Sequence, residues 1–170
     1  MWFQFCLVCS LKCFCLQFAT FSYSKLADYL WSGEWKKADD ETANLMIQVA
    51  GEGSNGYLDQ QAIEKFPCSD LRIIDFLWVY ASKGYFGFSV QKNIYQSLGG
   101  TSKYDEKVWK DFVNRVGWTN KKIYTGSGRT EFTLDSKAEA CFPHRIHQYE
   151  QQKKLCDFPS LASRLVNCNM

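Results

Sequence analysis

The stretch LWVYASKGYFGFSVQ, residues 77–91, changes character halfway along its length. Its first half has the spacing of a helix that buries one face, and Gly84 is well placed to end that helix. Tyr85, Phe86 and Phe88 then surround a second glycine, Gly87. Aromatic rings on such a bend either plug the end of a helical core or line a concave surface for a large flat ligand. The remainder of the sequence bears on this choice.

Short amphipathic helices account for most of the chain after residue 23. Glycines and capping residues separate runs whose apolar side chains recur at helical spacing, and the expected helices cover residues 24–33, 35–50, 60–66, 69–84, 89–99, 104–118 and 160–170. Asp59, Ser69 and Ser89 are expected to cap three of them. The acidic residues 39–41 are expected to face solvent, and residues 121–134 to form a small hairpin or an irregular loop. The pattern predicts an all-α fold.

The composition suggests one domain with a distinct N-terminal segment. The chain has 170 residues and a net charge of +2, so it carries no strong basic field for capturing nucleic acid. Residues 1–22 are rich in Cys and Phe and contain one charge, Lys12. Three interpretations of this segment remain open: a targeting signal, a helix buried against something missing here, or a poorly defined start of the reading frame. Residues 23–170 form the predicted domain.

Eight cysteines are present, but their placement does not suggest a disulfide framework. Four crowd the N-terminus and four are scattered: Cys6, Cys9, Cys13, Cys15, Cys68, Cys141, Cys156 and Cys168. A chain of this length does not need cross-links to fold, so we expect mostly free thiols in a reducing compartment. Cys68 is interpreted as a small buried hydrophobic residue. The single N-terminal CxxC lacks a second pair at zinc-ligand spacing, which disfavours a metal site.

No catalytic constellation is evident in the sequence. It contains no nucleophile elbow, phosphate-binding loop or dinucleotide-binding fingerprint. The two histidines, His144 and His147, lie at a spacing that could place them on one helix face, but exposed loop positions are the favoured interpretation. The sequence therefore favours a binding or regulatory protein over an enzyme.

Four motifs in order resemble the Genomes Uncoupled Four family of porphyrin-binding regulators of magnesium chelatase. The central motif is FPCSDLRIIDFLWVYASKGYFGFSVQKNIYQSLGG, residues 66–100. YLWSGEWKKADDETANLM (29–46) precedes it, and YDEKVWKDFVNRVGW (104–118) and SRLVNCNM (163–170) follow it. The resemblance extends over residues 23–170.

The resemblance implies a compact all-α domain shaped like a cupped hand, with an apolar groove open on one side. It implies binding of protoporphyrin IX and magnesium protoporphyrin IX, without catalysis. It further implies stimulation of magnesium chelatase through that enzyme's large porphyrin-carrying subunit, and hence a role in chlorophyll biosynthesis and retrograde signalling. The expected location is the plastid, in the stroma or in peripheral association with a membrane; a cyanobacterial cytoplasm is the alternative.

The resemblance also implies a set of binding residues. Those expected in or beside the groove are Val79, Tyr85, Phe86, Phe88 and Gln91, with Phe142 as an apolar cover and Arg72, Lys92 and Arg145 as partners for the propionates. Trp78 is expected in the core. Residues 140–154 correspond to the family's ligand-covering loop but depart from its usual sequence. His144 is considered as an axial ligand to bound magnesium, although water is favoured. The altered loop keeps open an alternative: a helical protein-interaction domain with little porphyrin affinity.

Overall fold

The computed structural model describes residues 21–54, 56–118, 140–144, 149–150, 153–154 and 158–170. Within these ranges the chain forms seven helices and one two-stranded ladder of four residues, which confirms the all-α class. The helices are α2 (Ser24–Trp31), α3 (Trp35–Val49), α4 (Gln60–Lys65), α5 (Cys68–Ala81), α6 (Phe88–Ser97), α7 (Glu106–Arg115) and α8 (Phe158–Asn167), and the strands are β1 (Tyr149–Glu150) and β2 (Lys153–Lys154). Most of the N-terminal segment and the expected hairpin at 121–134 lie outside the described residues.

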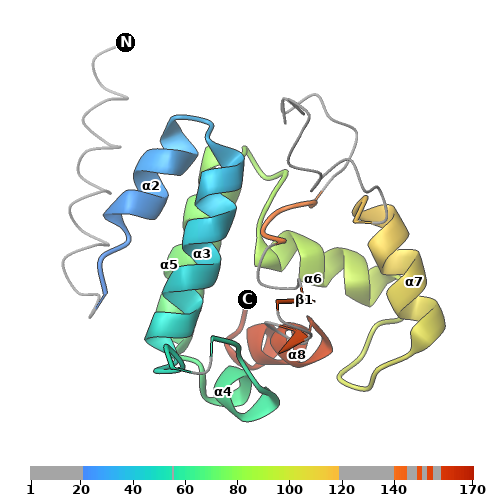
Figure 1. The fold of residues 1–170 in the computed structure, drawn as a ribbon. Coiled ribbons are helices and arrows are strands. Elements are labelled where there is room, and N and C mark those ends of the chain that lie inside the picture. The colour runs from blue at the N-terminus through green and yellow to red at the C-terminus, as the bar shows by residue number, and fades with distance from the viewer. Residues whose placement is uncertain (1–20, 55, 119–139, 145–148, 151–152, 155–157) are drawn as a thin grey trace.

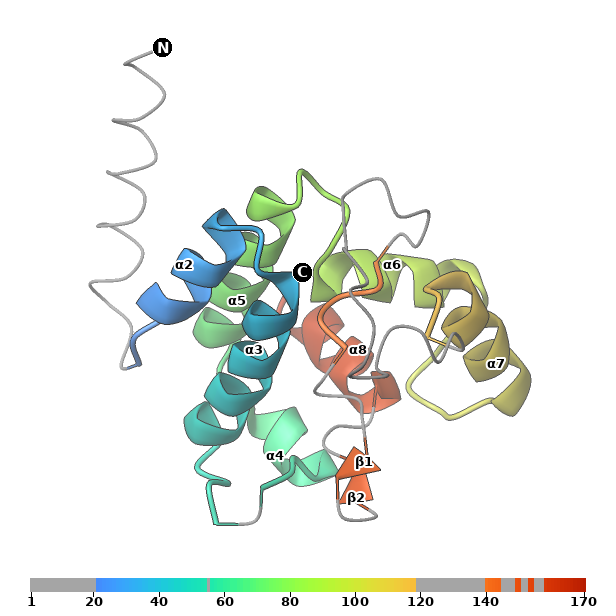
Figure 2. The ribbon, with the colours of Figure 1, turned by 45° about the horizontal axis from the view of Figure 1, so that its top comes forward.

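The helices form two groups joined by the bend between α5 and α6 (Figures 1 and 2). α2 packs against both α3 and α5, while α6 contacts α7 and α8. α8 also contacts α4, so it touches both groups of helices. In both views α8 lies below α6, with the α3–α5 pair on one side of it and α7 on the other. The bend therefore lies where the two groups meet.

Two buried clusters correspond to the two groups. The larger cluster includes Leu26 and Leu30 of α2, Met46 of α3 and the α5 stripe of Leu71, Ile74, Leu77 and Trp78. The smaller cluster joins Tyr95 of α6, Phe112 of α7 and Phe158 of α8. α8 contributes Leu161 and Leu165 to the first cluster and Phe158 and Ala162 to the second. The apolar face of α8 thus buries area in both clusters and holds the two groups together.

Side-chain caps explain some helix starts but not all that were expected. Asp59 accepts a hydrogen bond from Ala62 N at 2.8 Å and caps α4, as predicted. The predicted capping role of Ser69 is wrong, because α5 begins one residue earlier, at Cys68, and the Ser69 hydroxyl donates to Asp70. The predicted role of Ser89 is also wrong, since it lies inside α6 and its backbone N–H donates to Asp75.

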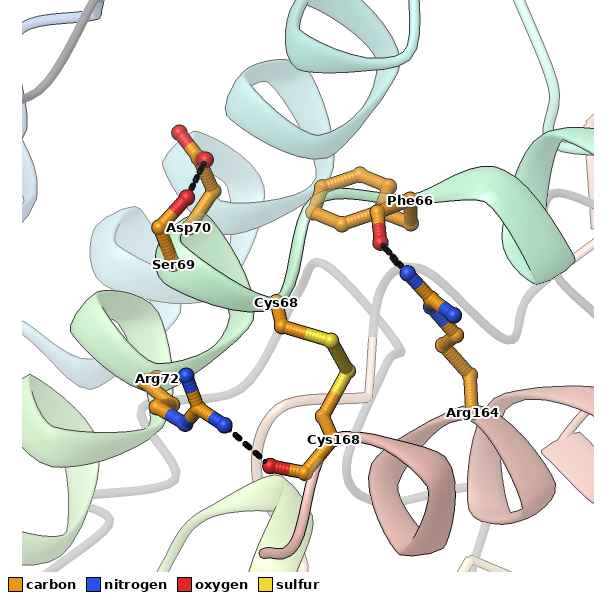
Figure 3. The surroundings of a disulfide bond; sticks show 7 residues. All are labelled: Phe66, Cys68, Ser69, Asp70, Arg72, Arg164 and Cys168. Atoms are coloured by element: carbon orange, nitrogen blue, oxygen red, sulfur yellow. Dashed lines mark hydrogen bonds between the residues drawn. A yellow bond between two sulfur atoms is a disulfide. The ribbon is translucent and has the colours of Figure 1, made fainter.

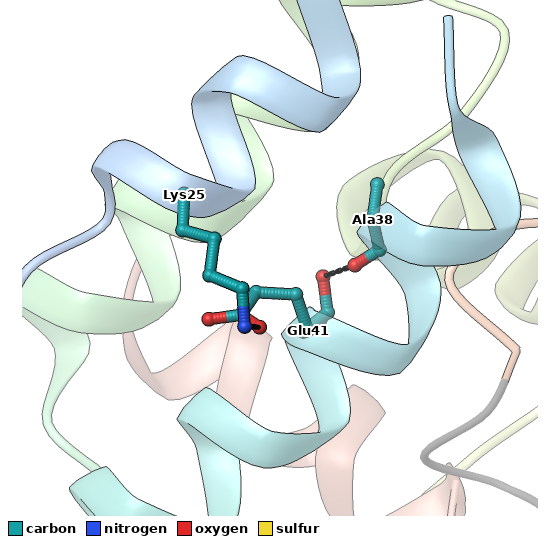
Figure 4. A network of polar contacts seen from close by, with 4 residues as sticks. Lys25, Ala38 and Glu41 are labelled. Atoms are coloured by element: carbon teal, nitrogen blue, oxygen red, sulfur yellow. Dashed lines mark hydrogen bonds and ion pairs between the residues drawn. The ribbon is translucent and has the colours of Figure 1, made fainter.

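The acidic run on α3 is not uniformly solvated. Glu41 forms an ion pair with Lys25 of α2, with 2.6 Å between Oε2 and Nζ, beside the bond from the Thr42 hydroxyl to Ala38 O (Figure 4). Asp39, expected to face solvent, is buried and accepts a hydrogen bond from His144 N at 2.7 Å. Helical periodicity did not reveal this, because the partner lies 105 residues away.

The expectation of free thiols is wrong for two cysteines. Cys68 at the start of α5 and Cys168 just after α8 form a disulfide across 100 residues (Figure 3). Cys141 is free and buried, and burial raises the pKa of its thiol to about 12. None of the described helices combines the length and the apolar character needed to cross a bilayer.

Candidate functional site

The bend between α5 and α6 is built from glycines and one serine. After α5 ends, Gly84 adopts a φ of +88° and its N–H returns to Val79 O at 2.8 Å. The Ser82 hydroxyl donates to Trp78 O at 2.7 Å and accepts from Phe86 N at 2.8 Å. The bend is therefore held by specific backbone contacts, in agreement with the predicted sharp turn.

Gly87 is required by both its backbone and its neighbours. Its φ is +142°, and a Cβ atom there would lie 2.7 Å from Val79 Cγ2 and 2.9 Å from Asp75 Oδ1. Asp75 also accepts Ser89 N at 2.8 Å, so a side chain of α5 fixes the first turn of α6. Burial raises the pKa of Asp75 above its ordinary value, although hydrogen bonds from Ser89 and Phe88 and the charge of Lys92 oppose that rise.

A strap of residues 140–143 runs along the bend. Ala140 N donates to Tyr85 O at 2.8 Å, and Gly87 N donates to Phe142 O at 3.0 Å. Gln91 is fully buried, and its Nε2 donates to Ala140 O at 3.0 Å and Pro143 O at 2.8 Å. Gln91 was expected beside the groove; the structure uses its amide to hold this strap.

The predicted groove rings are packed inside the molecule. Phe86, Phe88 and Phe142 are each at most 2% exposed, whereas an open groove would leave them accessible. Phe86 meets Phe142 edge to face at 5.5 Å, and Phe142 stacks on Trp78 at 5.7 Å. Of the two alternatives for the bend, Phe86, Phe88 and Phe142 therefore fill the end of the helical core. The sequence analysis expected a core position for Trp78 but not for these three rings.

An open apolar pocket lies on the outer side of the same bend. It has a volume of about 620 Å³ and is lined by Leu30 and Trp31 of α2 and by Val79, Tyr80, Ala81, Lys83 and Gly84 of the α5 end. Val79 is the residue of the predicted set that lines it. Tyr85 is next to this lining in sequence and 48% exposed.

An exposed aromatic row extends from this pocket along α5. Phe76 and Tyr80 stack with ring centroids 5.7 Å apart, and Trp31 lies 6.2 Å from Tyr80. The sequence reasoning missed Trp31, Tyr80 and Lys83. The signal was present for Tyr80, because Phe76 and Tyr80 lie four residues apart on the face of α5 opposite its buried stripe. Lys83 lies beyond the end of α5, with a φ of +56°.

The predicted propionate partners are engaged elsewhere. Arg72 donates from a terminal guanidinium nitrogen to Cys168 O at 2.5 Å, and Lys92 Nζ donates to the main-chain oxygen of Met170. Lys92 is also mostly buried. Arg145 and His147 lie outside the described residues. The cation that the structure places at the pocket rim is Lys83.

His144 is buried, contrary to the exposed position favoured for it. Its ring lies 4.6 Å from that of Trp118, whose Nε1 donates to Cys141 O at 2.9 Å. Among the described residues, no group of three or more His, Cys, Asp or Glu side chains is placed to hold a metal ion.

Comparison with known proteins gives a consistent set of relatives. Residues 17–157 match a family model described as GUN4-like. A Ycf53-like protein of Synechocystis is 34% identical over 105 residues, covering 61% of this chain and 42% of that protein. A protein of Arabidopsis thaliana named tetrapyrrole-binding protein, chloroplastic, is 34% identical over 101 residues, covering 56% of this chain and 34% of that protein. The matches thus span less than half the length of these curated relatives.

Solved structures show the same fold. The ligand-free structure of Arabidopsis thaliana GUN4 matches with a TM-score of 0.58 and 27% identity over 74% of this chain and 85% of that one. The structure of GUN4 from Chlamydomonas reinhardtii matches with a TM-score of 0.64 and 22% identity over 88% of this chain and 89% of that one.

Proposed function

Because the chain belongs to the GUN4-like family, we propose that it is a non-catalytic regulator that binds tetrapyrroles. The observation that carries this proposal is the open apolar pocket beside the α5–α6 bend, whose lining comes from the two motifs at residues 29–46 and 66–100. The proposed ligands are protoporphyrin IX and magnesium protoporphyrin IX. The proposed partner is the large porphyrin-carrying subunit of magnesium chelatase, whose reaction the protein would stimulate in a plastid.

The chemistry of the pocket suits a flat, largely apolar disc with anionic groups on one edge. Its volume of about 620 Å³ falls within the ordinary size range of small-molecule sites. Val79, Trp31 and Tyr80 offer apolar and aromatic surface for a ring face. Lys83 offers a cation for a propionate. Covering several hundred Å² of apolar surface gives roughly 10 kcal/mol gross, before ordering and association costs reduce it.

The buried rings have a supporting role in this proposal. Phe86, Phe88 and Phe142 fill the inside of the bend whose outer side carries Val79 and Gly84. A rigid bend keeps the pocket wall in place before ligand binds, which reduces the ordering cost of association. Arg145 stays a prediction as a propionate partner.

A second function is a protein-interaction domain with little porphyrin affinity. The observation that favours it is the exposed aromatic row of Trp31, Phe76 and Tyr80, with Tyr85 also exposed on the bend. Exposed aromatic residues of this kind are enriched at protein interfaces. The closed packing of the inner rings is also consistent with this function.

Titration with deuteroporphyrin, followed by tryptophan quenching, separates the two functions. We expect saturable quenching that weakens in Tyr80→Ala, because Tyr80 lines the pocket next to Trp31. Tyr104→Ala is the matched control, since Tyr104 is also exposed but lies outside the pocket lining. No quenching at micromolar porphyrin would exclude the first function. Chelatase turnover with and without the protein at limiting magnesium then tests the proposed stimulation.

A further inference from the structure

The segment after α8 is fastened to the rest of the domain by one covalent bond and two cations. The disulfide joins Cys168 to Cys68, and Arg72 donates to the carbonyl oxygen of that same Cys168 (Figure 3). Two residues later, the main-chain oxygen of Met170 accepts from Lys92 of α6. Both cations were expected from the sequence to meet propionates, and both meet main-chain oxygens of residues 168–170 instead.

We propose that the Cys68–Cys168 pair is a thiol–disulfide exchange site whose reduction frees Arg72 for an anionic ligand. The co-reactant is a dithiol of the thioredoxin class. Its thiolate attacks the Cys68 sulfur, the Cys68–Cys168 bond breaks, and Cys168 leaves as a thiolate that takes up a proton. The second thiol of the reductant then displaces Cys68. Two electrons and two protons pass to the protein, and the reductant ends as a disulfide.

The placement of the two sulfurs suits this direction of attack. Cys68 is partly exposed and is the first residue of the 14-residue helix α5, whereas Cys168 is buried. Partial positive charge at a helix N-terminus stabilises a thiolate, so Cys68 is a favourable leaving group in the second step.

Reduction changes what holds the two cations. In the oxidised protein, residues 168–170 cannot move away from α5, because the link at Cys168 is covalent. In the reduced protein, hydrogen bonds and the packing of Met170 on the larger cluster remain. A ligand carboxylate is a stronger acceptor for Arg72 than the main-chain carbonyl of Cys168. The gating part of this inference rests on the proposed tetrapyrrole function; the exchange site itself does not.

Differential alkylation of the full chain tests the exchange site. The oxidised protein is treated with iodoacetamide before and after incubation with reduced thioredoxin, and labelled cysteines are located by mass spectrometry. We expect Cys68 and Cys168 to label only after reduction, and hydrogen exchange in residues 158–170 to rise at least tenfold. Buried Cys141 is the internal control and stays unlabelled in both states while the protein is folded. Labelling of Cys68 without reductant, or unchanged exchange after reduction, would overturn the exchange site.

Porphyrin titration in both redox states tests the gating. Because one charge-assisted hydrogen bond changes affinity by about tenfold, we expect deuteroporphyrin to bind about tenfold tighter to the reduced protein. Its dimethyl ester, which has no carboxylates, should show no gain. Arg72→Gln should abolish the gain. Equal affinity of deuteroporphyrin for the two states would overturn gating but leave the proposed function intact. Absence of binding in both states would overturn the proposed function, and with it gating, while alkylation decides the exchange site alone.

Discussion

Asp75 on α5 accepts the backbone N–H of Ser89 on α6 at 2.8 Å, with its carboxyl group almost completely buried. This contact joins the two helices across the bend that carries the proposed site. Since Gly87 also approaches Asp75 closely, the carboxyl group fixes both the turn and the start of the next helix.

Replacing Asp75 by alanine should destabilise the protein by about 1–3 kcal/mol, because the buried N–H of Ser89 loses its acceptor. Asp75→Asn keeps an acceptor oxygen of similar shape, so it is the matched control and should lose much less. Urea denaturation of both variants at neutral pH measures the difference. Equal losses in the two variants would show that the acceptor role of Asp75 contributes nothing to stability.

Asp75 should also make the free energy of unfolding depend on pH. The pKa of Asp75 is raised in the folded state, mainly by burial. A raised pKa means that this group favours folding most below its ordinary pKa and that this contribution is lost as pH rises through the folded value. Asp75→Asn removes the titration. The free energy of unfolding of the variant minus that of the wild type should therefore increase from about pH 3 to pH 7. A difference that is flat or decreases with pH would contradict the assigned direction.

Substitution of the two bend glycines should have unequal effects. Gly84→Ala incurs the cost of a left-handed backbone, about 1–2 kcal/mol, and its new Cβ meets no atom within 4 Å. Gly87→Ala adds overlap with Val79 and Asp75, which should cost a further 1–3 kcal/mol or so. Thermal or urea unfolding of the two variants gives the comparison directly. The prediction is wrong if Gly84→Ala is as destabilising as Gly87→Ala.

The sequence predicted the features that depend on neighbouring residues. It did not predict contacts between segments far apart in the chain. The glycine ends, the Asp59 cap and the α5 stripe follow from neighbours within a few residues, and all are confirmed. The Cys68–Cys168 bond, the burial of Asp39 and the partners of Arg72 depend on segments about 100 residues apart. Periodicity carries no information about such pairings.

The sequence predicted the bend after α5 but not which way its side chains face. The motif located the bend, and Val79 does line an open apolar pocket there. The rings of Phe86 and Phe88 point inward, because the bend places them against Trp78 and the larger cluster. Tyr80 and Lys83 face outward from the end of the same helix. The position of a residue on the bend does not determine which side its side chain faces. That direction depends on packing against α3 and residues 140–143.

Loss of the disulfide should lower stability substantially. The link closes a loop of about 100 residues, for which restriction of the unfolded chain contributes about 4–5 kcal/mol. The variant with both Cys68→Ser and Cys168→Ser should therefore unfold at a clearly lower urea concentration than the oxidised wild type, and reductant should have no further effect on it. Cys141→Ala controls for loss of a buried sulfur without a cross-link. If reductant leaves the unfolding midpoint of the wild type unchanged, the link does not stabilise the fold.

Removing the charge of Lys83 should weaken binding of carboxylate-bearing porphyrins in particular. Lys83 lines the pocket rim, and an exposed ion pair of this kind contributes about 1 kcal/mol, or roughly a fivefold change in dissociation constant. Lys83→Gln should therefore raise the dissociation constant for deuteroporphyrin about fivefold at low salt, and the effect should shrink as salt screens the charge. Lys103→Gln is the matched control, since Lys103 is exposed but does not line the pocket. Equal weakening in both variants would indicate a general effect of net charge, and an unchanged affinity in Lys83→Gln would place the propionates away from this rim.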